Sequence, residues 1–341
     1  MPPGAGSVPG PACYGQGNTR PTLTDAQVVL GRINAQRPLG GELKSLDVDA
    51  ARRAIAEHVG KPLKLSTDDA AAAIVRVADA RMAGAIRLVS IERGHDPQKF
   101  VAMPFGGGGA LHVGALIREI GLKSAVVPRF PGITSALGCV LADLRHDMVQ
   151  TVNLMLEGLY APALATRMAT AGKEASEVIK AAGIPIERLD VIYELDMHYL
   201  GQTHTVSVPL PVDADARGLN EALVRKAFEQ TYSASFSRLL PGLAVRIVSL
   251  RVAAIGRRPP FDFSVFAADA SASLDKGRAG SRRVWFDGGF RETSIWSRLA
   301  LPAGATIEGP AILEQPDATT VIEPGHVGRV DRLGNVIVER A

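Results

Sequence analysis

Four consecutive glycines lie within the segment Phe100-Val-Ala-Met-Pro-Phe-Gly-Gly-Gly-Gly-Ala-Leu-His112. The apolar run Phe100–Phe105 is typical of a short buried strand. The residues from Ala110 to Ile120 have the composition of a helix, which Gly121 ends. The glycines between these elements therefore predict a tight loop from a strand into a helix.

A second strand and a second helix follow directly. Ala125-Val-Val-Pro128 predicts another buried strand, and Ile133–Leu144 predicts an Ala- and Leu-containing helix. Strand, glycine loop, helix, strand and helix in this order indicate a parallel βαβ unit and hence an α/β fold.

The glycine loop is the main candidate binding site. Glycines after a strand let backbone N–H groups approach an anion, because no Cβ obstructs them, and the dipole of the next helix favours negative charge. The spacing of Gly106, Gly107, Gly108 and Gly109 fits neither the Rossmann pattern GxGxxG nor the P-loop pattern. Each glycine costs about 0.5–1 kcal/mol relative to alanine, so the quartet needs a reason. Nucleotide or anion binding and close strand–helix packing both provide one.

Two titratable residues near glycine-rich loops are candidate catalytic residues. His112 lies in the first turn of the predicted helix, where it either forms a structural hydrogen bond or contacts nucleotide or substrate. Asp25 follows Thr24 at a predicted helix start. It either caps that helix or, as a buried carboxylate beside a Gly/Pro loop, orients Mg²⁺ or water.

Two other groups carry weaker signals. Asp143, His146 and Asp147 have the spacing of one helix face, but local ion pairs in solvent explain them as well as a metal does. Cys13 has no histidine or aspartate partner identifiable nearby in the sequence, so a nucleophilic role is not favoured. We assign no metal-binding residue.

The N-terminal part of the chain combines a loop with helices. Residues 1–21 are rich in Gly and Pro, which disfavour both helix and central strand. Thr22 or Thr24 then caps a helix that ends near Ile33. The clearest helix of the chain spans residues 66–90, where apolar residues recur at helical spacing.

Strands dominate from Leu189 onward. A predicted helix over Asn153–Ala182 precedes this region. Within it, a hairpin is predicted from the segments Val191–Leu200 and Thr203–Pro209. A helix near Gly218–Tyr232 and a strand over Val245–Ala254 follow. These elements predict an α/β region over 1–150, an α+β domain over 151–265, a linker over 266–282 and a β-rich module over 283–341.

Composition restricts the class of protein. The chain of 341 residues is 46% hydrophobic and 21% charged, as in ordinary soluble globular proteins. Its net charge of +3 comes from 38 basic and 35 acidic residues, which does not indicate a nucleic-acid partner. The two cysteines show no metal-ligand spacing, and no apolar run is long enough to span a membrane. We therefore expect a cytoplasmic protein with no nucleic-acid or membrane partner.

Three segments together resemble the hydantoinase A/5-oxoprolinase family. The first is Pro9-Gly-Pro-Ala-Cys-Tyr-Gly15 with Pro21-Thr-Leu-Thr-Asp-Ala26. The second is the glycine segment, continued by Val127-Pro-Arg-Phe-Pro-Gly-Ile-Thr-Ser-Ala-Leu-Gly138. The third is Gly309-Pro-Ala-Ile-Leu-Glu-Gln315 with Pro324-Gly325.

The resemblance implies the second lobe of an actin-like ATPase fold, followed by a β-rich α+β C-terminal domain. It implies an enzyme that uses ATP and Mg²⁺ to phosphorylate the ring carbonyl oxygen of a cyclic amide, a hydantoin or 5-oxoproline, so that the ring opens. A hydantoinase B-type subunit is the implied partner. Gly106–Gly109 match the second-lobe loop that lies against the adenosine and phosphates, and Asp25 and His112 match positions in the family's motifs.

The chain also departs from the family pattern. The first-lobe phosphate loop of the type Gly-Ile-Asp-x-Gly-Gly-Thr does not occur in it, and Gly108 stands where alanine is common. We therefore expect a truncated enzyme whose first lobe is supplied by a separate polypeptide, a truncated gene model, or a chain that has lost catalysis. A subunit of an ATP-dependent acetone or acetophenone carboxylase and a non-catalytic assembly subunit are the alternative functions.

Overall fold

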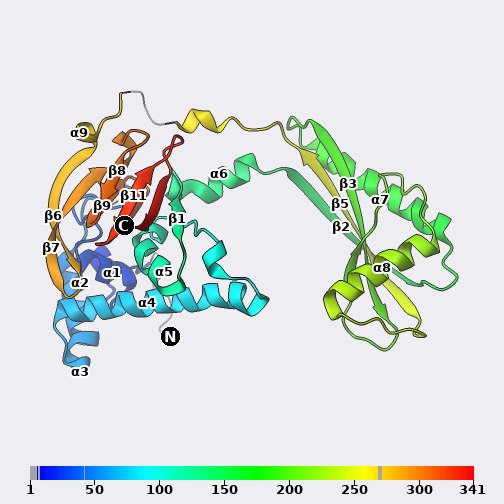
Figure 1. Cartoon of the computed structure of the whole chain (residues 1–341), viewed down its shortest axis with the longest axis horizontal. Coiled ribbons are helices and arrows are strands. Elements are labelled where there is room, and N and C mark those ends of the chain that lie inside the picture. Colours follow the sequence, from blue (N-terminus) through cyan, green and yellow to red (C-terminus); the bar gives the residue numbers. More distant parts are fainter. Residues whose placement is uncertain (1–5, 7, 42, 268–270) are drawn as a thin grey trace. The chain divides into compact units, whose positions relative to one another are not determined.

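A computed structural model describes residues 6, 8–41, 43–267 and 271–341. The chain forms two compact units, Met1–Gly138 with Asp262–Ala341 (unit 1) and Cys139–Phe261 (unit 2). Each unit contains helices and strands (Figure 1). The mixed α/β class expected from the sequence is confirmed.

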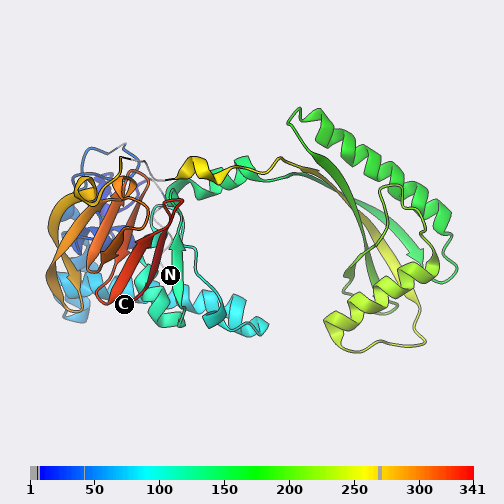
Figure 2. The same ribbon diagram turned by 45° about the horizontal axis from the view of Figure 1, so that its top comes forward.

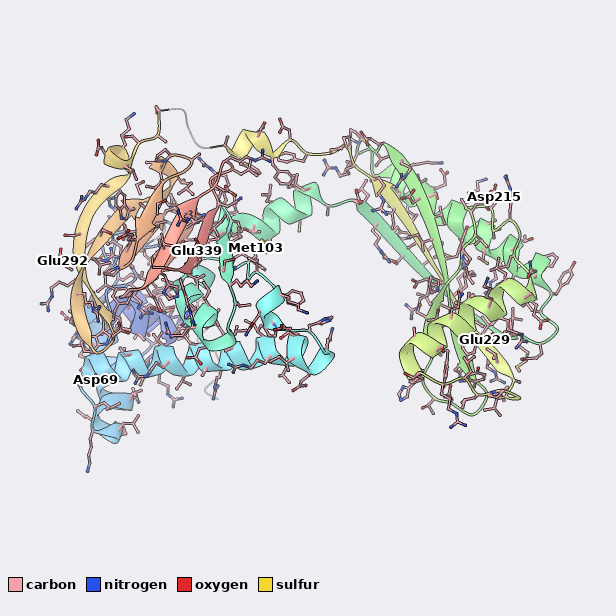
Figure 3. The ribbon with its side chains drawn as sticks, viewed as in Figure 1. Asp69, Met103, Asp215, Glu229, Glu292 and Glu339 are labelled. Atoms are coloured by element: carbon pink, nitrogen blue, oxygen red, sulfur yellow. The ribbon has the colours of Figure 1, made fainter. Side chains whose placement is uncertain are left out.

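Helix α4, Thr67–Ser90, is the longest helix in the described part of unit 1, and α1, α2 and α5 pack against it. The hydroxyl of Ser66 accepts the backbone N–H of Asp69, which satisfies a free donor of the first turn. Asp69 is labelled on this turn in Figure 3. The helix predicted over 66–90 is confirmed. The helices and helical turns of unit 1, with α6 continuing into unit 2, are η1 Ala12–Tyr14, α1 Leu23–Val29, α2 Val48–Ile55, η2 Ala56–Gly60, α3 Lys61–Leu63, α4 Thr67–Ser90, η3 Ile91–Arg93, η4 Pro97–Lys99, η5 Gly109–Leu111, α5 Val113–Ile120, η6 Pro131–Ile133, α6 Thr134–Leu141, η7 Phe263–Phe266, α9 Leu274–Gly277 and η8 Arg298–Ala300.

Helix α1 is shorter than the sequence predicts. Thr22 caps it by accepting the N–H of Asp25, but the helix ends at Val29 and not near Ile33. Gly31 has a φ of 73°, the left-handed conformation that ends helices and favours glycine. A Cβ at this position would lie 2.6 Å from the carbonyl oxygen of Arg283. The backbone at this glycine therefore both stops the helix and admits a neighbouring segment.

The strands of unit 1 form two four-stranded sheets. Their orders are β1-β12-β11-β8 and β10-β9-β7-β6, and the pairs are antiparallel except for the parallel pair β7 and β9. Their bounds are β1 Ser124–Val127, β6 Arg278–Phe286, β7 Gly289–Ser297, β8 Thr306–Glu308, β9 Ala311–Gln315, β10 Ala318–Ile322, β11 His326–Val330 and β12 Val336–Arg340.

The predicted parallel βαβ unit is largely replaced by antiparallel pairing. The run Phe100–Phe105 is not a strand, and only Ala102 forms an isolated parallel bridge, to Ala125. Its side chains are not buried: Met103, for example, is 55% exposed (Figure 3). Strand β1 instead pairs antiparallel with β12, the last strand of the chain. This pairing gives β1 its ladder hydrogen bonds, which a buried backbone needs.

The compact units differ from the division expected from the sequence. Residues 283–341, expected as a separate module, pack within unit 1, because β12 pairs with β1 and β10 contacts α5. The expected linker 266–282 contains α9 and the start of β6, and its residues 268–270 lie outside the described part of the chain. Residues 1–5 and 7 of the predicted N-terminal loop also lie outside it.

Unit 2 is an α+β layer. Its strands β2 Leu144–Met155, β3 Arg188–Tyr199, β4 Val206–Pro209 and β5 Val245–Arg257 form an antiparallel sheet of order β2-β5-β3-β4. Helices α7 Ala161–Ala181 and α8 Glu221–Phe236 share one hydrophobic core with it (Figure 2). Alternate residues of β3, such as Tyr193 and Leu195, face that core. The predicted hairpin is confirmed as β3 paired with β4.

Strand β2 occupies residues for which the sequence predicted helix in two places. It extends to Met155, so that α7 begins at Ala161 and not near Asn153. It also contains His146 and Asp147, which were predicted to share a helix face with Asp143. Neighbouring residues of a strand point to opposite faces, so this trio does not form a common face. Across the described residues, no helix combines the length and hydrophobicity needed to cross a membrane.

Candidate functional site

The glycine loop leads into the core of unit 1. Gly106 has a φ of 80° and donates its N–H to the carbonyl of Pro131 at 2.6 Å. Gly109 begins the short turn η5, and His112 is the residue that caps α5. One short helical turn therefore separates the quartet from α5. The prediction that the glycines open directly into the helix is wrong.

A cavity of about 290 Å³ adjoins this loop within unit 1. Of the quartet, Gly107 and Gly108 line it. Its other walls come from η1, from α1, from the segment after α1, and from η5 with the residue that follows it. They are mostly apolar, with four polar side chains, and consist of Tyr14, Leu23, Thr24, Gln27, Ile33, Pro38, Leu39, Leu43, Leu46, Leu111 and His112. We call this space the glycine-loop cavity.

His112 is held at the cavity by two other elements. Its side chain is buried, and Nδ1 lies 2.6 Å from Oδ1 of Asp79 on α4. Nε2 lies 3.5 Å from Nε2 of Gln27 on α1. The structural reading of His112 is therefore confirmed by its buried contact with Asp79, and its place in the cavity wall leaves contact with a nucleotide or substrate as a prediction.

Asp79 and Gln27 were not among the residues predicted from the sequence. The signal for Asp79 was nevertheless present, because Val75, Asp79 and Ala83 follow at four-residue spacing and all three are buried. A carboxylate within the apolar stripe of a helix needs a buried partner. Gln27, which is 1% exposed, carried no comparable signal.

Asp25 is placed beside the cavity and not in its wall. Its buried carboxylate accepts the backbone N–H groups of Ala12 at 3.1 Å and Cys13 at 2.8 Å. It also accepts the N–H and hydroxyl of Thr22 at 2.8 and 2.7 Å. The first two hydrogen bonds hold the turn η1, whose residue Tyr14 does line the cavity, and the other two hold the start of α1. The hydrogen bonds of Asp25 therefore hold the loop in place, and Asp25 itself is not among the residues that line the cavity.

The thiol of Cys13 is buried next to Asp25. Burial first, and then the negative charge of Asp25, raise the pKa of Cys13 well above its usual range. A protonated thiol is a poor nucleophile. The environment of Cys13 therefore disfavours a nucleophilic role for its thiol.

Two of the remaining candidates in unit 2, Asp143 and Asp147, form ion pairs. Asp143 accepts from Arg257 at 2.7 Å, and Asp147 accepts from Arg145. The pKa of each carboxyl is lowered, for Asp143 first by the backbone N–H of Arg258 and for Asp147 first by the side chain of Arg145. Within the described ranges, no cluster of three or more His, Cys, Asp or Glu residues is arranged to hold a metal ion.

Two family models place this fold in the hydantoinase/oxoprolinase family. The family model "Hydantoinase/oxoprolinase" matches residues 1–148, and the model "Hydantoinase/oxoprolinase C-terminal domain" matches residues 163–336. The chain belongs to this family, as the sequence motifs indicated.

Relatives and a solved structure agree with this assignment. The caprolactamase subunit alpha of Pseudomonas jessenii is 32% identical, over 95% of this chain and 47% of the relative. The acetophenone carboxylase gamma subunit of Aromatoleum aromaticum is also 32% identical, over 99% of this chain and 47% of the relative. A crystal structure of the ATP-dependent caprolactamase from Pseudomonas jessenii has a TM-score of 0.71 and 30% identity, over 99% of this chain and 49% of that chain. The chain spans about half the length of these relatives.

Proposed function

We propose that this chain is part of an ATP-dependent enzyme that opens a cyclic amide such as a hydantoin or 5-oxoproline. The observation that carries the proposal is the position of Gly107 and Gly108 in the wall of a cavity with His112. Its family membership and its similarity to a caprolactamase subunit, whose name refers to a cyclic amide, support the substrate class.

The cavity fits the nucleoside end of ATP better than its phosphates. A volume of about 290 Å³ with largely apolar walls suits a flat ring system. No Lys or Arg is among the residues that line it, so its described walls offer no cationic side chain to a triphosphate. Groups outside the cavity must therefore hold the phosphates and the Mg²⁺ that accompanies them. A separate first lobe is the proposed source of these groups.

The proposed chemistry uses ATP as a co-substrate. The amide oxygen attacks the γ-phosphorus and ADP leaves. The carbonyl oxygen, a poor leaving group, now carries a phosphoryl group and can later leave as phosphate. Water adds to the activated carbon, and the ring C–N bond breaks while the nitrogen takes a proton. A second water hydrolyses the resulting acyl phosphate to carboxylate and inorganic phosphate. In this scheme His112 contacts nucleotide or substrate, and Asp25 contributes through the loop that it fixes.

A second function is favoured by one observation. The acetophenone carboxylase gamma subunit is as similar to this chain as the caprolactamase subunit, at 32% identity. An ATP- and bicarbonate-dependent ketone carboxylase subunit is therefore the alternative.

The test uses the full chain together with a first-lobe polypeptide and a hydantoinase B-type subunit. ADP release and ring-opened product are measured with 5-oxoproline, hydantoin and caprolactam, and separately with acetone or acetophenone plus bicarbonate. We expect ADP release to depend on a cyclic amide. ADP release that depends on ketone and bicarbonate would favour the alternative, and ring opening that does not need ATP would refute the main proposal.

A variant pair tests the position of the nucleotide. Gly108 has a φ of −106° and no heavy atom within 4 Å of an added Cβ, so Gly108→Val narrows the cavity without backbone strain. Gly84→Ala on α4 is the matched control, because an added Cβ there also meets open space. We expect a tenfold or greater loss of ATP affinity in Gly108→Val only, by titration calorimetry. Unchanged affinity in Gly108→Val would remove the nucleotide from this cavity.

A further inference from the structure

The contact between Asp79 and His112 selects one tautomer of a neutral imidazole when the carboxyl of Asp79 is ionised. An ionised carboxylate can only accept hydrogen bonds, so the 2.6 Å contact to Asp79 requires a proton on Nδ1 of His112. In the neutral imidazole, Nε2 is then an acceptor. Both side chains are buried, at 4% exposure for His112 and 7% for Asp79, so water does not compete for this contact.

This tautomer in turn orients the side-chain amide of Gln27. An acceptor at Nε2 of His112 pairs with the amide nitrogen of Gln27, which lies 3.5 Å away. The amide oxygen Oε1 then faces away from the histidine. It is buried and has no hydrogen-bond partner among the residues that the structure describes. A buried acceptor without a partner is unfavourable, and a ligand donor can supply the missing hydrogen bond.

We propose that Gln27 is a specificity-determining residue that accepts an N–H from a flat ring bound in the glycine-loop cavity, and that Asp79 positions it through His112. Gln27 and His112 lie in a wall whose other members are mainly apolar, which suits a ring with one polar edge. The required edge is an N–H, found both in adenine and in a cyclic amide. If adenine supplies this N–H, the proposal rests on the function proposed above. If a cyclic amide supplies it, the proposal needs only that the amide binds in the cavity.

Pairs of probes that differ in this N–H distinguish the two sources. Adenosine is compared with N6,N6-dimethyladenosine, and 2-pyrrolidinone with N-methyl-2-pyrrolidinone, by calorimetry or ligand-observed NMR on the full chain. We expect methylation to weaken binding roughly 10- to 100-fold in one pair, because the acceptor is left without its donor. The pair that responds identifies the ligand.

The variant Gln27→Met removes the acceptor and keeps the length of the side chain. The methylated and unmethylated probes should then bind within about twofold of each other. Gln36→Met replaces an exposed glutamine of unit 1 and should retain the full discrimination. Discrimination that persists in Gln27→Met, or wild-type chain that does not distinguish the members of either pair, overturns the proposal.

The variant Asp79→Asn tests the positioning role. An asparagine N–H can donate to Nδ1, which moves the imidazole proton to Nε2, and Nε2–H then engages Oε1 of Gln27. We expect the ¹⁵N shifts of His112 to report the exchanged tautomer, with loss of discrimination by N-methylation. An unchanged tautomer together with unchanged discrimination shows that Asp79 does not act through His112.

The two proposals fail differently. Discrimination in the pyrrolidinone pair alone keeps the role of Gln27 and moves the nucleotide elsewhere. ATP-dependent ring opening without discrimination in either pair keeps the function and refutes the role of Gln27.

Discussion

The carboxylate of Asp25 accepts the backbone N–H of Cys13 at 2.8 Å, and thereby joins the first turn of α1 to a turn 12 residues earlier. The same carboxylate accepts the N–H of Ala12. Within the motif that resembles the family's, Asp25 therefore holds a Pro- and Gly-rich loop against the start of α1.

Asp25→Ala should destabilise the protein by about 3 kcal/mol, because it leaves the N–H groups of Ala12 and Cys13 buried without an acceptor. Chemical denaturation measures this loss. The exposed Asp49→Ala is the control and should change stability little. If Asp25→Asn instead keeps full stability and abolishes ring opening, Asp25 acts in catalysis.

Gly114 on α5 provides a second prediction. A Cβ at this position would lie 2.9 Å from the carboxylate of Glu323, which pairs with Arg118 at 2.7 Å. Gly114→Ala should therefore cost about 2 kcal/mol through overpacking. Gly84→Ala on α4 meets open space and should stabilise by about 1 kcal/mol, the ordinary helix preference for alanine. A stabilised Gly114→Ala would show that Glu323 can move aside.

Tyr193 should make unit 2 sensitive to alkali. Its hydroxyl donates to the carbonyl of Ala214 at 2.7 Å, and burial, followed by the charges of Asp215 and Asp213, raises its pKa to about 12. An unfolded tyrosine titrates near pH 10. Between about pH 10 and pH 12 the unfolded chain therefore loses this proton first, and stability falls as pH rises.

The variant Tyr193→Phe should show a smaller loss of stability than wild type between pH 9 and pH 11, measured by denaturation at each pH. At neutral pH it should be about 1 kcal/mol less stable, since the carbonyl of Ala214 loses its donor. Tyr160→Phe, at a position that is 73% exposed, is the control and should follow the wild-type curve. Identical pH slopes for wild type and Tyr193→Phe would contradict the assignment.

Arg298 connects segments of unit 1 that are distant in sequence. Its buried guanidinium donates to Oε1 of Gln315 at 2.9 Å and to the carbonyls of Val127 and Pro128. Lysine cannot reproduce this planar set of donors. Arg298→Lys should cost about 3 kcal/mol by denaturation, whereas Arg291→Lys, at a largely exposed ion pair, should cost under about 0.5 kcal/mol. Equal losses of stability in the two variants would show that Arg298 contributes only its positive charge and not its planar set of donors.

Local sequence signals predicted those elements whose causes are local. Ser66 caps α4 where the sequence placed the start of a helix, and Gly31 ends α1 because its backbone is left-handed. The hairpin of β3 and β4 follows from alternating polarity around Gly201. The glycine quartet, with His112 three residues later, likewise identified one wall of the cavity.

By itself, then, the sequence determined helix α4, the hairpin and the family. The tertiary structure decided that β1 pairs with β12 rather than with Phe100–Phe105, and that Asp79 and Gln27 meet at His112. Pairings of this kind join residues 33 and 85 positions apart at the histidine and more than 200 apart in the sheet. No propensity or spacing encodes them, because they depend on which buried hydrogen-bonding groups the packed core leaves facing one another.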